Sequence, residues 1–205
     1  MKKKWLLAGA IAGALGFILF ASPSGPRDLR VFDADRLAVL ECDMWRAYYA
    51  KQKFRLFSLL ITMLREQYRL PYSKALSVAY HWAKAAAYFG DARGEYEKTL
   101  PDLEEGYRTI GDHVGAKWNS EDLAHAELAW WIARRIPDQS SPENVGRLIG
   151  ELYAKIYEVP ASKVTQAGVL RAQAGYLRDQ HGDWNTVEGL LHDSYRLLRA
   201  SVQTH

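Results

Sequence analysis

Residues 141–157 read SPENVGRLIGELYAKIY, and this stretch decides the fold class of the 205-residue chain. Its opening Ser-Pro-Glu is a strong helix start, because serine can cap a helix and proline suits the first helical turn. Apolar side chains then recur with spacings that alternate between three and one, at Val145, Leu148, Ile149, Leu152, Tyr153 and Ile156. This periodicity predicts an amphipathic α-helix with one face in a core.

The same helical pattern runs through residues 33–205, with no strand-like alternation and no internal repeat. The first predicted helix begins at Asp33 or Asp35 and ends near Tyr68. Its run LFSLLITML at 56–64 is apolar nearly all round, as is typical of a central helix that is buried on several sides. Short connections favour antiparallel neighbours. We therefore predict an all-α bundle of six or seven helices. After the first, the longer segments lie near 74–89, 102–113, 120–135, 142–159, 162–179 and 183–202, and a short helix lies near 93–99.

The amino-terminal segment carries a separate signal. Residues 5–21 read WLLAGAIAGALGFILFA, an uncharged run of 17 residues behind three lysines. As a helix this run would cover about 25 Å, just under a hydrocarbon core of roughly 30 Å. A cleaved signal peptide is the alternative, but Leu19 lies two positions before Ala21 and makes a poor cleavage site. We expect residues 1–21 to be a transmembrane anchor or an uncleaved signal.

Residues 22–32, SPSGPRDLRVF, contain two prolines and a glycine and are predicted to be a short, stiff linker to the domain. The lysines before the anchor favour a cytoplasmic amino terminus, a bias that Arg27, Arg30 and Arg36 weaken. The expectation is a single-pass membrane protein that contacts the bilayer through residues 5–21, with its domain on the extracytoplasmic side.

Charge composition narrows the function classes. Lys and Arg number 27 against 24 Asp and Glu, a net charge of +3, and Lys2, Lys3 and Lys4 hold all of the excess. The rest of the chain is neutral overall, which excludes the basic footprint of a simple nucleic-acid-binding domain. The single cysteine, Cys42, excludes an intramolecular disulfide and a cysteine-rich zinc site. Its carboxylate neighbours should raise the thiol pKa, so we expect it to be unreactive.

Five charged residues fall on predicted apolar helix faces, where an unpaired charge is expensive to bury. They are two acids and three arginines: Glu41, Glu127, Arg134, Arg171 and Arg178. If buried, they should pair with one another. Such a network would either hold the bundle in register or line a polar pocket between helices, and the sequence leaves both alternatives open.

A ferritin-like metal centre is the sharpest enzymatic alternative. Such bundles use a Glu on each of two helices and a Glu-x-x-His motif on each of the other two. The single near match here is Asp122-x-x-His125, which has Asp in place of Glu, and Glu41 and His81 complete the candidate ligands. Because the second motif is missing, we expect no metal and no other cofactor.

The aromatic residues suggest an interface. Trp45, Tyr49, Trp130 and Trp131 all fall on predicted helices. The adjacent pair Trp130 and Trp131 must point about 100° apart on a helix, so both cannot enter the same core. Trp and Tyr are favoured at protein interfaces and at membrane interfaces. The four residues are therefore candidate contacts with a partner.

No phosphate-binding loop, His-Glu-x-x-His pair, nucleophile elbow or haem-attachment motif occurs in the sequence. The absence of these motifs, the lone anchor and the neutral, aromatic-rich domain together favour one function. We expect a non-catalytic accessory, assembly or stabilising subunit of a larger membrane protein complex. The alternative is an enzyme or small-molecule-binding domain. The first hypothesis predicts an exposed aromatic patch, and the second predicts a concave site on which the charged residues converge.

Overall fold

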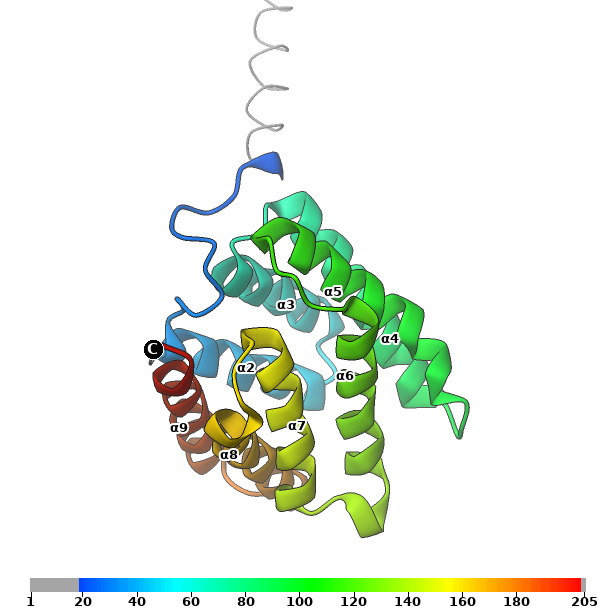
Figure 1. Cartoon of the computed structure of the whole chain (residues 1–205). Coiled ribbons are helices and arrows are strands. Elements are labelled where there is room, and N and C mark those ends of the chain that lie inside the picture. The colour runs from blue at the N-terminus through cyan, green and yellow to red at the C-terminus, as the bar shows by residue number, and fades with distance from the viewer. Residues whose placement is uncertain (1–18, 204–205) are drawn as a thin grey trace, which may run out of the picture.

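A computed structural model describes residues 19–203, and all regular secondary structure in that range is helical (Figure 1). The all-α prediction is confirmed for this part of the chain. It holds eight α-helices rather than the six or seven expected, together with the 3₁₀ helices η1 (Tyr96–Thr99) and η2 (Pro137–Gln139). The α-helices are α2 (Ala34–Tyr49), α3 (Lys53–Tyr68), α4 (Tyr72–Asp91), α5 (Leu100–Val114), α6 (Ser120–Arg135), α7 (Pro142–Tyr157), α8 (Ala161–Asp179) and α9 (Trp184–Gln203).

Capping side chains set several helix starts. Asp33 accepts a hydrogen bond from the Arg36 amide at the start of α2, and Ser141 accepts one from the Asn144 amide at the start of α7. The Asn119 side chain accepts from two amides of the first turn of α6. Each bond satisfies a backbone donor that has no partner within its helix. The predicted starts of these three helices are confirmed.

The prediction of one helix from Asp33 to Tyr68 is wrong. The chain breaks at residues 50–52, where Lys51 adopts a left-handed conformation with φ of 57°. This conformation is uncommon for a residue other than glycine, and no glycine or proline marks the break in the sequence. The break lets α3 fold back along α2, so that Arg36 Nε lies 2.8 Å from Glu66 Oε2.

The apolar run at 56–64 does not form a centrally buried helix, which corrects a second prediction. On α3 only Leu64 and Tyr68 are buried, and the remaining apolar side chains of the run are partly exposed. The reason is that α3 packs mainly on α2 and α4, and only its last turns contribute buried residues to the cluster that includes Ile110 of α5. Helix α3 therefore carries more apolar surface than its neighbouring helices cover.

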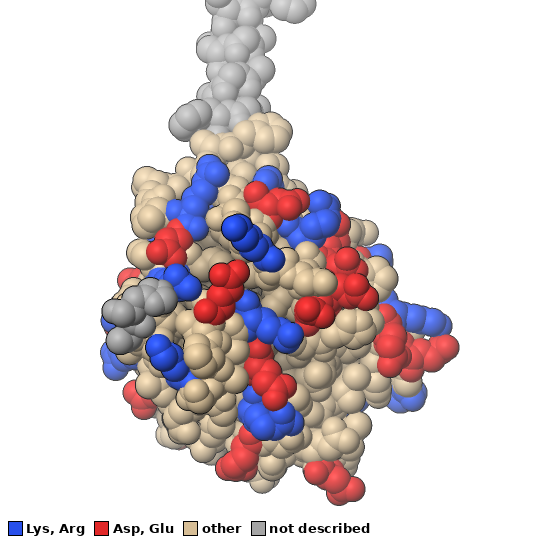
Figure 2. All heavy atoms as spheres, viewed as in Figure 1, with Lys and Arg blue, Asp and Glu red and all other residues tan. Residues whose placement is uncertain are grey.

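The largest part of the core lies between α2 and the three carboxy-terminal helices α7, α8 and α9. Gly146 and Gly150 on α7 face Gly168 on α8, and a Cβ atom on Gly168 would overlap the Gly146 carbonyl oxygen. The two backbones are thus in direct contact where the helices cross. Over the face in view, Figure 2 shows positive and negative side chains interspersed, in keeping with the neutral charge balance outside the three lysines.

The last part of the predicted linker lies on the domain. Phe32 is buried, and the Arg30 guanidinium donates to the Tyr157 carbonyl oxygen at 3.1 Å. Gln203, near the carboxyl end of α9, donates to the Arg30 carbonyl at 2.9 Å. The predicted anchor at residues 5–21 lies outside the described residues except for its last three. Within residues 19–203, no helix is both long enough and apolar enough to cross a membrane.

Candidate functional site

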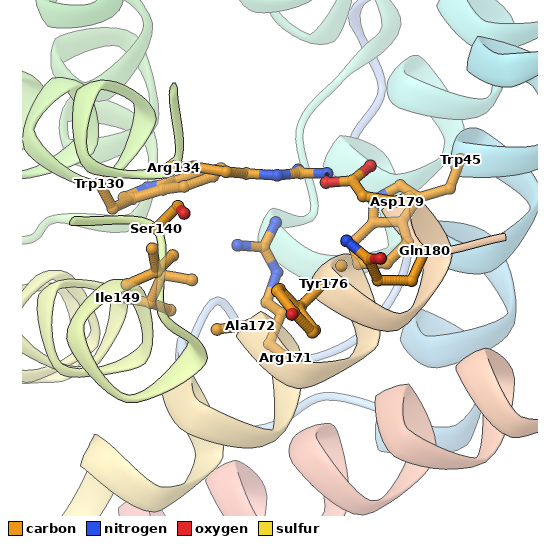
Figure 3. A pocket seen from close by; sticks show the side chains of 12 residues that line it. Trp45, Trp130, Arg134, Ser140, Ile149, Arg171, Ala172, Tyr176, Asp179 and Gln180 are labelled. Carbon is orange, nitrogen blue, oxygen red and sulfur yellow. Dashed lines mark hydrogen bonds and ion pairs between the residues drawn. The ribbon is translucent and has the colours of Figure 1, made fainter. Parts of the chain in front are cut away.

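A pocket of about 200 Å³ lies between α2, α6, α7 and α8 (Figure 3). Trp45 from α2 and Trp130 from α6 form its aromatic walls, and Val145 and Ile149 contribute apolar surface from α7. Polar groups come mainly from the end of α6 and from the carboxy-terminal half of α8. The polar side chains that line it are Arg134, Ser140, Arg171, Tyr176, Asp179 and Gln180.

An ion pair between Arg171 and Glu41 lies at the inner side of the pocket. Arg171 Nε donates to Glu41 Oε1 at 2.8 Å, and Arg171 Nη2 lies 2.6 Å from the same oxygen. Glu41 is 3% exposed, and the Arg171 side chain is 20% exposed at the pocket. Burial alone would lower the pKa of Arg171, but the Glu41 carboxylate outweighs burial and raises that pKa well above the usual arginine value. Arg171 therefore stays charged.

A second ion pair crosses the outer side of the pocket. Arg134 Nη2 lies 2.8 Å from Asp179 Oδ2, and the Tyr49 hydroxyl donates to the other oxygen of the same carboxylate. Burial and the bond to Asp179 raise the pKa of Tyr49 to about 12, so its hydroxyl remains a donor at neutral pH. Figure 3 shows Arg134 reaching across to Asp179, with the Arg171 guanidinium beneath it.

Buried polar atoms beside the pocket lack partners. Glu41 Oε2 and Trp130 Nε1 are both buried, and neither makes a hydrogen bond to any residue that the structure describes. The Arg171 guanidinium carbon lies 5.1 Å from the centre of the Trp130 ring. Unsatisfied buried groups are few in native proteins and each needs an explanation, such as a bound water or ligand.

Glu127 and Arg178 take roles outside the pocket lining. Glu127 accepts from the Tyr107 hydroxyl at 2.7 Å and from Trp131 Nε1 at 2.8 Å, which ties α5 to α6. Arg178 stacks over Trp184, 4.5 Å from the ring centre, and over Tyr49 at 4.9 Å. Its Nη1 donates to the Gly182 carbonyl at 3.0 Å, and it forms no ion pair with any described carboxylate.

The structure separates the four predicted interface residues. Trp45 and Trp130 line the pocket, and Tyr49 binds Asp179. Trp131 points elsewhere and packs on Phe89, with ring centres 5.2 Å apart. The two adjacent tryptophans thus pack in different surroundings, as helix geometry requires.

Sequence reasoning missed Asp179, Tyr176, Gln180 and Ser140. Asp179 ends α8 and is exposed, so nothing in its local pattern distinguishes it from an ordinary surface acid. Its partner Tyr49 lies 130 positions away in the chain. The only available signal was indirect, since Arg134 and Tyr49 were both candidates that needed a polar partner.

The weak metal candidates have other partners or surroundings. His81 Nδ1 lies 2.7 Å from Asp102 Oδ1, and Glu41 pairs with Arg171. Asp122 and His125 are exposed on α6. Across residues 19–203, no group of three or more histidine, cysteine or acidic side chains is placed to hold a metal ion.

Cys42 is buried, and its pKa is raised to about 12. The raised thiol pKa expected from the sequence is confirmed, although burial is its main cause rather than the adjacent carboxylates.

A second surface is notable for its exposed apolar side chains. Tyr72, Leu76 and Tyr80 recur at every fourth position along α4 and are all exposed. On α3, Phe54 is 95% exposed. Residues four apart lie on the same helix face, so the three α4 side chains form one stripe.

Comparisons with known protein families, with curated proteins and with solved structures found no match to this chain.

Proposed function

We propose that the protein is a membrane-tethered helical domain that binds a small molecule in the pocket between α2, α6, α7 and α8. The observation that carries this proposal is convergence. Four residues singled out for their charge or aromatic character, Trp45, Trp130, Arg134 and Arg171, come from three different helices and line one hollow. Concave sites with aromatic walls and a few convergent polar groups are the usual form of small-molecule sites.

The pocket chemistry supports binding more than catalysis. Arginine side chains stay protonated at neutral pH, so they hold and orient a ligand rather than transfer its protons. Arg134 and Asp179 are 39% and 43% exposed. An exposed ion pair contributes only about 0–1 kcal/mol to stability, so the fold does not depend on keeping Arg134 bound to Asp179.

Ligand-induced stabilisation tests the proposal. The full chain in detergent micelles is screened by thermal unfolding and by tryptophan fluorescence against small acids, phosphates, amines and neutral compounds. A ligand at 100 times its Kd stabilises the folded state by about 2.7 kcal/mol, which gives a clear rise in Tm. We expect at least one chemical class to produce this rise together with a change in tryptophan emission.

A pocket-filling variant supplies the control. Gly175 borders the pocket, and a Cβ atom there would make ordinary contacts with Arg134 and Trp45. Gly175→Leu should abolish the ligand response, whereas Gly189→Leu, at an open position on α9, should keep it. The proposal fails if no class stabilises the wild-type chain, or if the response persists in Gly175→Leu.

A second candidate function is the accessory subunit of a membrane complex, and the exposed stripe of Tyr72, Leu76 and Tyr80 favours it. Gentle solubilisation and native separation should then show the chain travelling with a larger membrane protein. The double variant Leu76→Glu, Tyr80→Glu should release that partner, and Gly189→Leu should retain it. Migration of the wild-type chain alone would contradict this second function.

A further inference from the structure

The charges that line the pocket favour exchange of one anion for another. They are two arginines, Arg134 and Arg171, and one carboxylate, Asp179. Glu41 pairs with Arg171 at the inner side, so the charges balance while Asp179 is bound to Arg134. A ligand with one negative charge that displaces the exposed Asp179 from Arg134 would keep this balance.

The donors of Arg171 are placed for such a ligand. Its Nε and Nη2 are occupied by Glu41, but Nη1 donates to no residue in the described part of the chain. In Figure 3 the Arg171 guanidinium points into the hollow below Arg134. A guanidinium offers paired N–H groups whose geometry matches a carboxylate, so an anion between the two arginines could contact both.

The site is also preorganised. Glu41 holds Arg171 in place through contacts at 2.8 and 2.6 Å before any ligand arrives. Less side-chain freedom is then lost on binding, which strengthens affinity.

The remaining lining sets the shape of the ligand. Trp45 and Trp130 offer flat aromatic surfaces, and Val145 and Ile149 offer aliphatic ones. The volume of about 200 Å³ is below the roughly 300–1,000 Å³ of pockets for drug-sized ligands. The space therefore suits a compact apolar body rather than a nucleotide or a long chain.

We infer that the ligand is a small monocarboxylate with a flat or compact apolar body, and that its carboxylate replaces Asp179 on Arg134 while contacting Arg171. This inference rests on the proposed small-molecule function. Asp179 competes with the ligand carboxylate for Arg134, and the Tyr49 hydroxyl donates a hydrogen bond that keeps Asp179 beside Arg134. A ligand with an equivalent group needs only to exchange one carboxylate for another.

Matched probes test the ligand class. Benzoate, cyclohexanecarboxylate, benzamide, phenyl phosphate and benzylamine are titrated into the full chain in micelles, with tryptophan fluorescence and calorimetry as readouts. The two carboxylates should bind at least about tenfold more tightly than benzamide, a difference of about 1.4 kcal/mol. Phenyl phosphate, with nearly two negative charges, should bind more weakly than benzoate, and benzylamine should not compete.

Two variants should shift benzoate binding in opposite directions. Asp179→Asn removes the competing carboxylate and should tighten binding several-fold. Arg134→Gln removes the guanidinium that donates to the exchanged carboxylate and should weaken binding about tenfold or more. Arg147→Gln, which alters an exposed ion pair with Glu151 on α7, is the matched control and should leave the Kd unchanged. A purely structural Asp179 would not give tighter binding when replaced.

The outcomes separate the two proposals. Equal binding of benzamide and benzoate, blocked by Gly175→Leu, would keep the pocket as a binding site and overturn the carboxylate class. Tighter binding of phenyl phosphate would overturn it in favour of a phosphate ester. Weaker benzoate binding in Asp179→Asn would overturn the exchange with Arg134. No response to any probe or screened compound would overturn the proposed function itself.

Discussion

Helices α7 and α8 approach so closely that their backbones touch, whereas α3 and α4 leave much of their apolar surface uncovered. Where α7 and α8 cross, Gly146 and Gly168 bring the two backbones into contact. Seven residues of α7 are buried. On α3, which carries the most continuous apolar run of the domain, two residues are buried. Apolar content therefore indicates a helix that can be buried, but small residues indicate where another helix comes close.

A large effect is expected at the crossing of α7 and α8. Gly168→Ala adds a Cβ atom that would overlap the Gly146 carbonyl oxygen, so the helices must move apart. Overpacking of this kind typically costs about 1–3 kcal/mol, and a clash with backbone places it near the upper end. Urea unfolding followed by circular dichroism measures the change.

Gly189→Ala is the matched control for that substitution, because nothing lies within contact distance of its added Cβ on α9. It should stabilise the protein by about 0.5–1 kcal/mol through the helix preference for alanine. If both substitutions shift the unfolding free energy equally, the close contact between α7 and α8 does not determine how tightly these two helices pack.

The next effect concerns the ion pair between α2 and α8. Glu41→Gln leaves the Arg171 charge without its partner in a largely buried setting. Breaking such a pair costs about 3–5 kcal/mol when both groups are fully buried, and the partial exposure of Arg171 lowers the expectation to about 2 kcal/mol. Thermal unfolding of the variant measures the loss.

Adding Arg171→Met to Glu41→Gln should recover most of that loss, because removal of both charges avoids an unpaired one. An unchanged melting temperature in Glu41→Gln alone would show that the ion pair does not stabilise the packing of α2 on α8. Failure of the double variant to recover would instead point to lost packing around the Arg171 side chain.

Sequence patterning predicted much of this architecture. The helix over 120–135 is confirmed at both ends, and most later boundaries fall within two residues of their predictions. It failed where the chain turns without a turn residue, at Lys51, and where burial depends on neighbours, at 56–64. The two failures have different causes. No glycine or proline marks the left-handed Lys51, and local sequence specifies a helix and its apolar face but not how many other helices come to cover it.

The candidate site, too, could be predicted only in part from the sequence. A charge on an apolar stripe is visible in the sequence, and this found Glu41, Arg134 and Arg171. The partner of each charge is set by tertiary packing, so Asp179 was missed. Glu127 shares a predicted face with Trp130, but it turns to Tyr107 and Trp131.

A smaller effect is expected at the junction of α4 and α5. Burial would raise the pKa of Asp102, but hydrogen bonds and charges of Lys84 and His81 outweigh burial and lower it below the usual value of 3.8. The unfolded chain thus takes up this proton first as pH falls. The stabilisation by Asp102 is complete above pH 3.8 and is lost as pH falls through the lower folded-state pKa.

Asp102→Asn tests that junction. At pH 7 it should cost about 1–2 kcal/mol, because it weakens the bonds of the buried Asp102 carboxylate to His81 and to the exposed Lys84. Because a protonated aspartic acid resembles asparagine in charge, the difference from wild type should shrink below pH 3.8. Unfolding curves at pH 7 and at pH 3 measure this trend, and a constant difference would contradict it.

The smallest effect is expected on the exposed stripe of α4. Leu76 is 50% exposed, and Leu76→Ala should change the unfolding free energy by no more than about 0.5 kcal/mol. The same substitution at Leu64, which is 1% exposed on the neighbouring helix, should cost about 2–4 kcal/mol because it leaves a cavity. Urea unfolding of both variants compares identical chemistry at two depths.

This last comparison bears on why the stripe exists. An exposed apolar side chain that does not stabilise the fold lowers solubility and adds nothing to the free energy of unfolding. If Leu76→Ala proves nearly neutral, the stability of the fold does not account for the exposed stripe of Tyr72, Leu76 and Tyr80, as the accessory-subunit hypothesis requires. If it costs as much as Leu64→Ala, α4 is covered in solution by part of the same molecule, and α3 and α4 are packed as fully as α7 and α8.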